Sequence, residues 1–116
     1  MSEEILDLIE VMDRVQDDKE LLLELFDIFI IDYSEKRKLL EKAVAANDVD
    51  QVMSISHSLK GASGNISAKS MRETFLKLEM MGKSGSLSEA KASLGLLDQQ
   101  FGDLQNRINQ VRIEFK

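Results

Sequence analysis

The C-terminal stretch LSEAKASLGLLDQQFGDLQNRINQVRIEF, residues 87–115, carries the most regular pattern in this 116-residue chain. Its apolar residues recur in alternating steps of three and four, the spacing of one face of an α-helix. Ser86 and Glu89 stand at the spacing of a capping box, in which each side chain accepts a backbone hydrogen bond from the other residue. The pattern predicts a helix of about 29 residues, roughly 43 Å long. The stripe consists of Leu87, Ala90, Leu94, Leu97, Phe101, Leu104, Ile108, Val111 and Phe115.

Three more helices are expected upstream of this one. The longest covers about residues 18–46, and its LLLELFDIFII run adds a second apolar face that needs a second neighbour. Shorter helices are expected at about 49–66 and 68–81, the second ended by the glycines within 82–85. The main stripe of the longest helix is Leu22, Phe26, Phe29, Tyr33, Lys36, Leu40 and Ala43. A short amphipathic segment would cover its second face with Ile5, Leu8, Ile9 and Met12.

The fold class follows from these segments and from the short connections between them. No segment alternates apolar and polar residues as a strand would. Short connections favour antiparallel neighbours. We therefore expect an all-α chain, an antiparallel up-down four-helix bundle with a short additional N-terminal helix, forming one domain over residues 1–116.

Composition narrows the classes of function. The chain has no cysteine and no proline and holds one histidine, which argues against thiolate chemistry and against a metal or haem site. Its net charge of −6, without a basic stripe, disfavours nucleic acid and anionic membrane as partners. No apolar run approaches the roughly 20 residues of a membrane span. The acidic opening MSEEILDLIE does not resemble a signal peptide, so we expect a cytoplasmic protein.

The single histidine, His57, falls within the expected helix at 49–66. That helix has an apolar stripe of Val52, Ile55, Leu59, Ala62 and Ile66. His57 lies roughly 170° from the centre of the stripe, and Gly61 and Gly64 lie within about 40° of His57. Each glycine costs a helix roughly 0.5–1 kcal/mol relative to alanine. We interpret them as clearance that lets a large partner approach one exposed imidazole.

Other side chains of this face have bland and functional interpretations. Lys60 is a helical neighbour of His57 and would place a positive charge beside it, although such pairs are common on any helix. Met53 lies one turn before His57 and is either part of a contact patch or a residue at the core boundary. Gly64 alone could begin the end of the helix, whereas Gly61 comes too early for that.

The stretch HSLKGASGNISA, which begins at His57, resembles the signature H-x-x-K-G-x-x-G-x-x-G-A of histidine-containing phosphotransfer (HPt) domains. The acidic opening before a long helix, the Leu78-Glu79 pair and the break at 82–85 before a long last helix also resemble this family. The likeness covers nearly the whole chain. One position departs from the pattern, since Ser67 replaces the last glycine. It falls at a turn between helices, where we expect serine to serve as an N-cap.

The resemblance implies a phosphorelay intermediate. His57 would accept a phosphoryl group on Nε2 from a receiver-domain aspartate and pass it to another, and Lys60 would stabilise its charge. Gly61, Gly64 and Met53 would meet the partner. Glu79 occupies a position that in some members hydrogen-bonds the Nδ1 atom of the histidine, although a solvated glutamate is the alternative.

The resemblance also implies what the chain lacks and what it meets. No cofactor is expected, because Mg²⁺ would belong to the receiver, and no nucleotide-binding loop is present, so no autonomous kinase activity is expected. The expected partners are receiver domains of a hybrid sensor kinase or of response regulators, met by a monomer.

Three other hypotheses stay open at this point. A non-catalytic adaptor could bind a partner through the same exposed face. The dimerisation region of a sensor kinase is disfavoured, because such a region has an acidic residue after its histidine, where this chain has Ser58. A metal- or haem-binding bundle lacks ligands.

Overall fold

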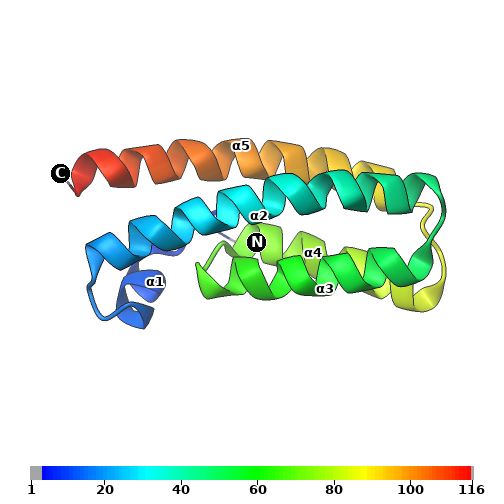
Figure 1. Ribbon diagram of the computed structural model, residues 1–116, viewed down its shortest axis with the longest axis horizontal. Helices are drawn as coiled ribbons and strands as arrows, with labels where there is room; N and C mark the ends of the chain where they lie inside the picture. The colour runs from blue at the N-terminus through cyan, green and yellow to red at the C-terminus, as the bar shows by residue number, and fades with distance from the viewer. Residues whose placement is uncertain (1–3, 116) are drawn as a thin grey trace.

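The computed structural model describes residues 4–115, and within that range the chain forms α-helices and no strand (Figure 1). Residues 1–3 of the acidic opening, and Lys116, lie outside the described residues. The all-α expectation is confirmed. The helices are α1 (Leu8–Arg14), α2 (Lys19–Ala45), α3 (Val49–Asn65), α4 (Lys69–Ser84) and α5 (Ala90–Glu114).

The four longer helices run alternately up and down the long axis of the molecule (Figure 1). α3 packs between α2 and α4, and α5 packs against both α4 and α2, which closes the bundle. The short α1 packs against α2. The expected antiparallel four-helix bundle with a short N-terminal helix is therefore confirmed. None of the helices in the described range is both long and apolar enough to cross a membrane.

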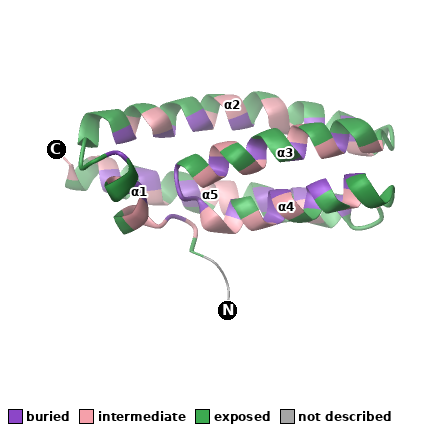
Figure 2. Cartoon of the chain, turned by 90° about the horizontal axis from the view of Figure 1, so that it is seen from below, coloured by how far each residue is buried: buried purple, intermediate pink, exposed green. Residues whose placement is uncertain are grey.

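Helical periodicity identified the core correctly in α2 and α5. Every residue of the expected α2 stripe is buried apart from Lys36, and the α5 stripe is buried or packed against the core along its length (Figure 2). The Tyr33 ring lies with its centroid 4.3 Å from that of Phe101 and 6.2 Å from that of Phe75. Aromatic contacts therefore join α2 to both α4 and α5.

Aspartates begin three of the helices. The carboxylates of Asp7, Asp18 and Asp48 each accept a backbone hydrogen bond from the third residue after them, at 3.0, 3.0 and 3.1 Å. The capping box expected for α5 is wrong. Glu89 is the residue before that helix, no side chain caps it, and α5 has 25 residues, not about 29.

The buried face of α3 is rotated from the expected one. Ser56 and Ser63 are fully buried with Val52 and Leu59, whereas Ile55 and Ala62 of the expected stripe are only partly buried. Hydrophobicity pointed away from the serines, but small side chains suit a close helix contact. The rotation places His57 about 140° from the centre of the buried face, on the side of α4.

Glycines of α4 set both its packing and its end. The helix continues past the expected end at Met81 to Ser84. Gly82 is buried, and a Cβ atom placed on it would lie 2.8 Å from the Cβ and backbone N atoms of Met53. Gly85 ends the helix with φ +79°, the left-handed conformation expected of a glycine after a helix.

The N-terminal segment covers one end of the bundle. Leu6 and Val11 are buried, whereas Ile9, which we expected to help cover α2, is 88% exposed. The segment is tied to the α3–α4 turn by backbone hydrogen bonds, because Asp7 N donates to Ser67 O at 3.0 Å and Ser70 N donates to Glu4 O at 2.9 Å. α1 therefore lies beside the α3–α4 pair (Figure 2).

Candidate active site

His57 projects from α3 with 69% of its side chain exposed. Its Nδ1 atom lies 2.7 Å from Oε2 of Glu79, which reaches it from α4. The Glu79 side chain is only 6% exposed, so the alternative of a solvated glutamate is wrong. The close α3–α4 contact at Gly82, about one turn beyond Glu79, brings the carboxylate within reach of the imidazole.

Glu79 is held in its charged form. Lys60 Nζ donates to its Oε1 at 2.6 Å. The Lys60 ammonium, with a smaller contribution from His57, lowers the pKa of Glu79 although burial acts in the opposite direction. A carboxylate can only accept a hydrogen bond, so Nδ1 of the neutral imidazole carries the hydrogen. Nε2 is then left with its lone pair.

Lys60 is partly buried, with 21% of its side chain exposed. From the sequence we expected a positive charge standing beside His57. The structure instead places Lys60 and His57 on the two oxygens of one carboxylate. The three side chains form one hydrogen-bonded unit across the α3–α4 seam.

The glycines on this face have different surroundings. A Cβ atom on Gly61 would meet nothing within 4 Å, whereas one on Gly64 would lie 3.5 Å from the Arg72 side chain. Met53 is partly buried and touches Gly82, so it stands at the core boundary. The surface beside His57 is thus bare at Gly61 and bordered by an arginine near Gly64.

On the other flank of His57, α2 contributes a lysine that sequence reasoning assigned to the core stripe. Lys36 Nζ donates to Ser58 Oγ at 2.7 Å and pairs with Asp32 at 3.0 Å. The signal in the sequence was a lysine within an otherwise apolar stripe. It brings a second positive charge next to the residue that follows His57.

The turn after α3 differs from the expected one. Ser67 has φ +58°, is 2% exposed, and its Oγ has no hydrogen-bond partner among the described residues. The residue that precedes α4 is Ala68, without a side-chain cap, so the expectation of a serine N-cap is wrong. The backbone here adopts the left-handed conformation that favours the glycine of the family pattern.

An exposed histidine on a four-helix bundle, with a buried carboxylate on its Nδ1 atom, is an arrangement suited to carrying a phosphoryl group. The profile of the Hpt domain family matches residues 24–112, and the chain belongs to that family. Its role is phosphotransfer in two-component systems, whose Hpt proteins interact with receiver domains of kinases and response regulators.

A solved structure agrees with this assignment. The crystal structure of histidine-containing phosphotransfer protein B from Pseudomonas aeruginosa PAO1 is similar to this chain with a TM-score of 0.82 and 26% sequence identity. The similarity covers 97% of each chain. Among curated protein sequences, none matches the chain.

Proposed function

We propose that this chain is a phosphorelay intermediate in which His57 takes a phosphoryl group from the aspartyl phosphate of one receiver domain and gives it to the aspartate of another. One observation carries the proposal. The exposed imidazole has its Nδ1 atom engaged by the buried Glu79 carboxylate, which leaves Nε2 as the free nucleophilic atom.

The proposed step balances without proton transfer. The Nε2 lone pair attacks phosphorus, and the bond between phosphorus and the aspartyl oxygen breaks with its electrons leaving on the carboxylate. The imidazole, which keeps its hydrogen on Nδ1, becomes positively charged, and the Glu79 carboxylate offsets that charge. In the return step the second aspartate attacks phosphorus and the N–P electrons go back to Nε2.

The neighbouring residues take supporting roles in this proposal. Lys60 holds Glu79 ionised and lies close enough to the imidazole to stabilise an arriving phosphoryl group. Gly61 gives the receiver room to bring its aspartate to Nε2. The receiver's acidic pocket would supply Mg²⁺. The chain would act as a monomer in the cytoplasm and would have no kinase activity of its own.

The test is phosphoryl transfer from a panel of phosphorylated receiver domains. Wild-type protein should acquire an acid-labile, base-stable phosphate, as a phosphoramidate does, and His57→Gln should acquire none. Incubation with ATP and Mg²⁺ alone should leave no label. Equal labelling of the glutamine variant would overturn the assignment of His57. Receiver binding without any transfer would favour the adaptor hypothesis instead.

A further inference from the structure

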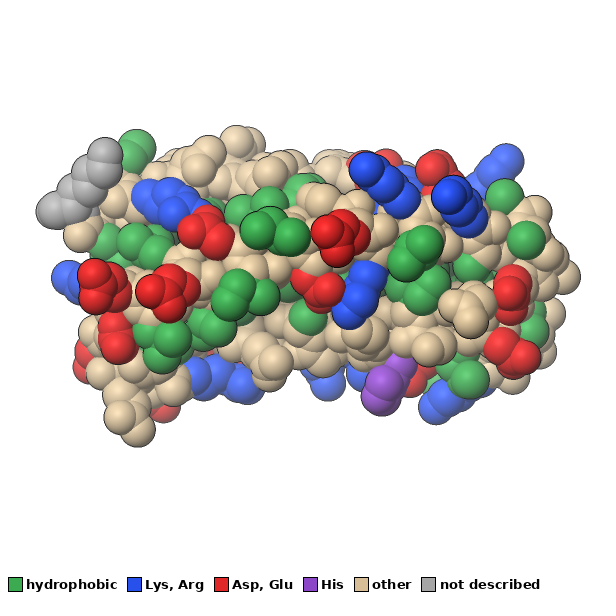
Figure 3. Space-filling model, viewed as in Figure 1, with side chains coloured by type: hydrophobic (Ala, Val, Ile, Leu, Met, Phe, Trp, Pro, Cys, Tyr) green, Lys and Arg blue, Asp and Glu red, His purple; other side chains and the backbone are tan. Residues whose placement is uncertain are grey.

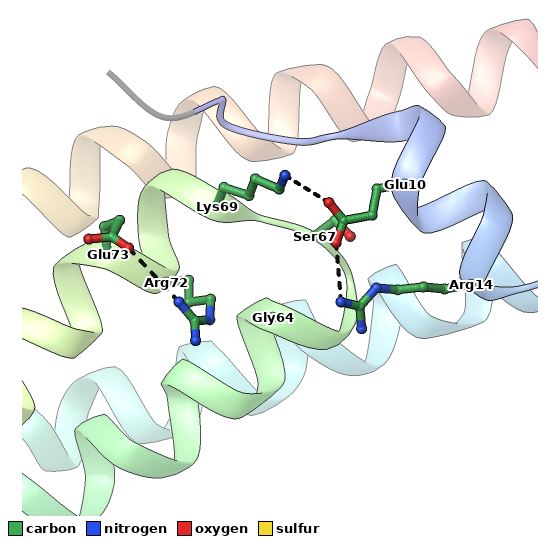
Figure 4. Close-up of a pocket in the computed structure, with 7 residues that line it drawn as sticks. All are labelled: Glu10, Arg14, Gly64, Ser67, Lys69, Arg72 and Glu73. Atoms are coloured by element: carbon green, nitrogen blue, oxygen red, sulfur yellow. Dashed lines mark hydrogen bonds and ion pairs between the residues drawn. The ribbon is translucent and has the colours of Figure 1, made fainter. Parts of the chain in front are cut away.

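A cavity of about 370 Å³ opens between α1 and the α3–α4 turn (Figure 4). Side chains from both ends of the turn and from α1 surround it, and the close-up shows Arg14 and Arg72 on either side of Gly64. Its lining residues are Glu10, Arg14, Gly64, Ser67, Lys69, Arg72 and Glu73. A cavity of this size can admit a partner's side chain.

The lining favours an anion. Three cationic side chains face two carboxylates, and one of these, Glu10, is already paired with Arg14 at 3.1 Å and with Lys69 at 2.7 Å. Arg72 has less satisfied donors, because its Nη1 atom is 3.9 Å from Glu73 Oε1, beyond hydrogen-bonding distance. Its donors remain available to a further oxygen.

A second observation points to a ligand in the same cavity. Ser67 lines it, is 2% exposed, and has a hydroxyl without a partner among the described residues. A buried hydroxyl without a partner costs free energy, so an accepting oxygen in the cavity would remove that cost. A carboxylate could accept from the Ser67 hydroxyl and from the Arg72 guanidinium together.

The position of the cavity indicates what would fill it. Gly64 follows His57 by two helical turns on the same side of α3, about 10 Å along the helix. α1, α3 and α4 lie together in the view from below (Figure 2), and the histidine lies with several Lys and Arg side chains at the lower edge of the molecule in Figure 3. A receiver domain that reaches His57 would also cover the cavity.

We propose that this cavity receives an acidic side chain of the receiver domain and acts as a second contact point beside His57. The inference rests on the proposed function. In a chain of net charge −6, a local group of cations matched to an acidic partner gives electrostatic complementarity at the docking face. Arg72, bordering Gly64, is the specificity-determining residue of the contact.

The experiment uses the receiver domain that charges the wild-type chain fastest in the panel. Arg72→Gln and the double variant Arg14→Gln/Arg72→Gln should weaken receiver binding about tenfold or more. The transfer rate at saturating receiver should stay within about twofold, because the cavity does not contact the reacting atoms. The dependence of affinity on salt should become shallower. Arg107→Gln is the matched control, since Arg107 on α5 also has a carboxylate oxygen 3.9 Å from Nη1.

A charge exchange identifies the contact directly. Arg72→Glu should weaken binding further, and replacing one acidic residue of the receiver by arginine should restore binding to this variant alone. If the Arg72 variants bind like the Arg107 control, the cavity is not a receiver contact. If they do so while millimolar inorganic phosphate shifts the Arg14 and Arg72 side-chain NMR signals, the cavity is a small-anion site and the proposal is wrong. If no receiver charges the wild-type chain, the proposed function itself fails.

Discussion

Gly82 of α4 lies so close to Met53 of α3 that a Cβ atom on the glycine would be only 2.8 Å from the backbone nitrogen of Met53. The bare backbone of Gly82 therefore sets how closely the two helices approach. The same seam carries His57 on one helix and Glu79 on the other, 2.7 Å apart. The geometry of the candidate active site thus depends on a residue that contacts neither of them.

The first prediction compares two glycine-to-alanine substitutions. Gly82→Ala should lower the free energy of unfolding by about 1–3 kcal/mol, because its Cβ would clash with α3 backbone. Gly61→Ala should raise it by about 0.5–1 kcal/mol, because a Cβ there meets nothing and alanine favours helix. Urea unfolding measures both. Equal effects of the two substitutions would contradict the close packing at Gly82.

The second prediction concerns the turn after α3. Ser67→Gly should stabilise the fold by about 1 kcal/mol, because it relieves a left-handed backbone and removes a buried hydroxyl that lacks a partner. Asn47→Gly is the control, since Asn47 has φ +51° but is exposed and asparagine tolerates this conformation. Thermal unfolding should show the larger gain for Ser67→Gly. A loss of stability there would mean that the hydroxyl has an unrecognised role.

The third prediction concerns ionisation of Glu79. Lys60→Met should raise the pKa of the Glu79 carboxyl more than His57→Gln does, because Lys60 is the larger cause of its lowering. A lowered pKa in the folded state contributes stability that is present above the unfolded value of about 4.3 and is lost as pH falls through the folded pKa. In Lys60→Met that loss should therefore begin at higher pH. Carbon NMR titration of the Glu79 carboxyl checks the ranking, and an unchanged pKa in Lys60→Met would refute it.

The fourth prediction addresses the role of Glu79 in transfer. Glu79→Gln keeps a hydrogen-bond acceptor for Nδ1 but loses the charge that offsets the phosphorylated imidazole. Phosphoryl transfer to His57 should slow by roughly 10- to 100-fold. Receiver affinity should change little, because Glu79 is buried. Rapid-quench kinetics separate the two quantities. A transfer rate equal to that of wild type would leave Glu79 with a purely structural role.

The fifth prediction addresses clearance beside the imidazole. Gly61→Leu should keep the fold, since position 61 is exposed, and should slow transfer sharply by obstructing the receiver. Circular dichroism tests the fold and single-turnover kinetics test the transfer. An intact variant that transfers at the wild-type rate would remove the explanation offered for the glycine.

Much of this architecture could be predicted from the sequence, because long helices display their buried faces as a 3.6-residue period. The stripes of α2 and α5 were identified correctly, and so was the helix-ending role of glycine at Gly85. The period failed on α3, where buried Ser56 and Ser63 are polar in composition but small enough for the seam. It also failed where a single side chain decides a terminus, as at Glu89.

The candidate site was predictable in part. His57, Gly61 and Lys60 stood out because a helix seldom places two glycines around its only histidine. The sharing of Glu79 between His57 and Lys60 could not be worked out from spacing, since it depends on how closely α3 and α4 approach. The contact of Lys36 with Ser58 joins α2 to α3, and a one-dimensional pattern contains no information on such a pair.

The exposure of His57 also bears on how long a signal would last. If the imidazole carries a phosphoryl group, 69% exposure leaves that group in water, and within residues 4–115 no side chain folds over it as a lid. Its survival would depend on the intrinsic hydrolysis of the N–P bond and on how often receivers collide with it. The duration of the signal would then be set by the abundance of the partners, and this chain would hold the phosphate without timing it.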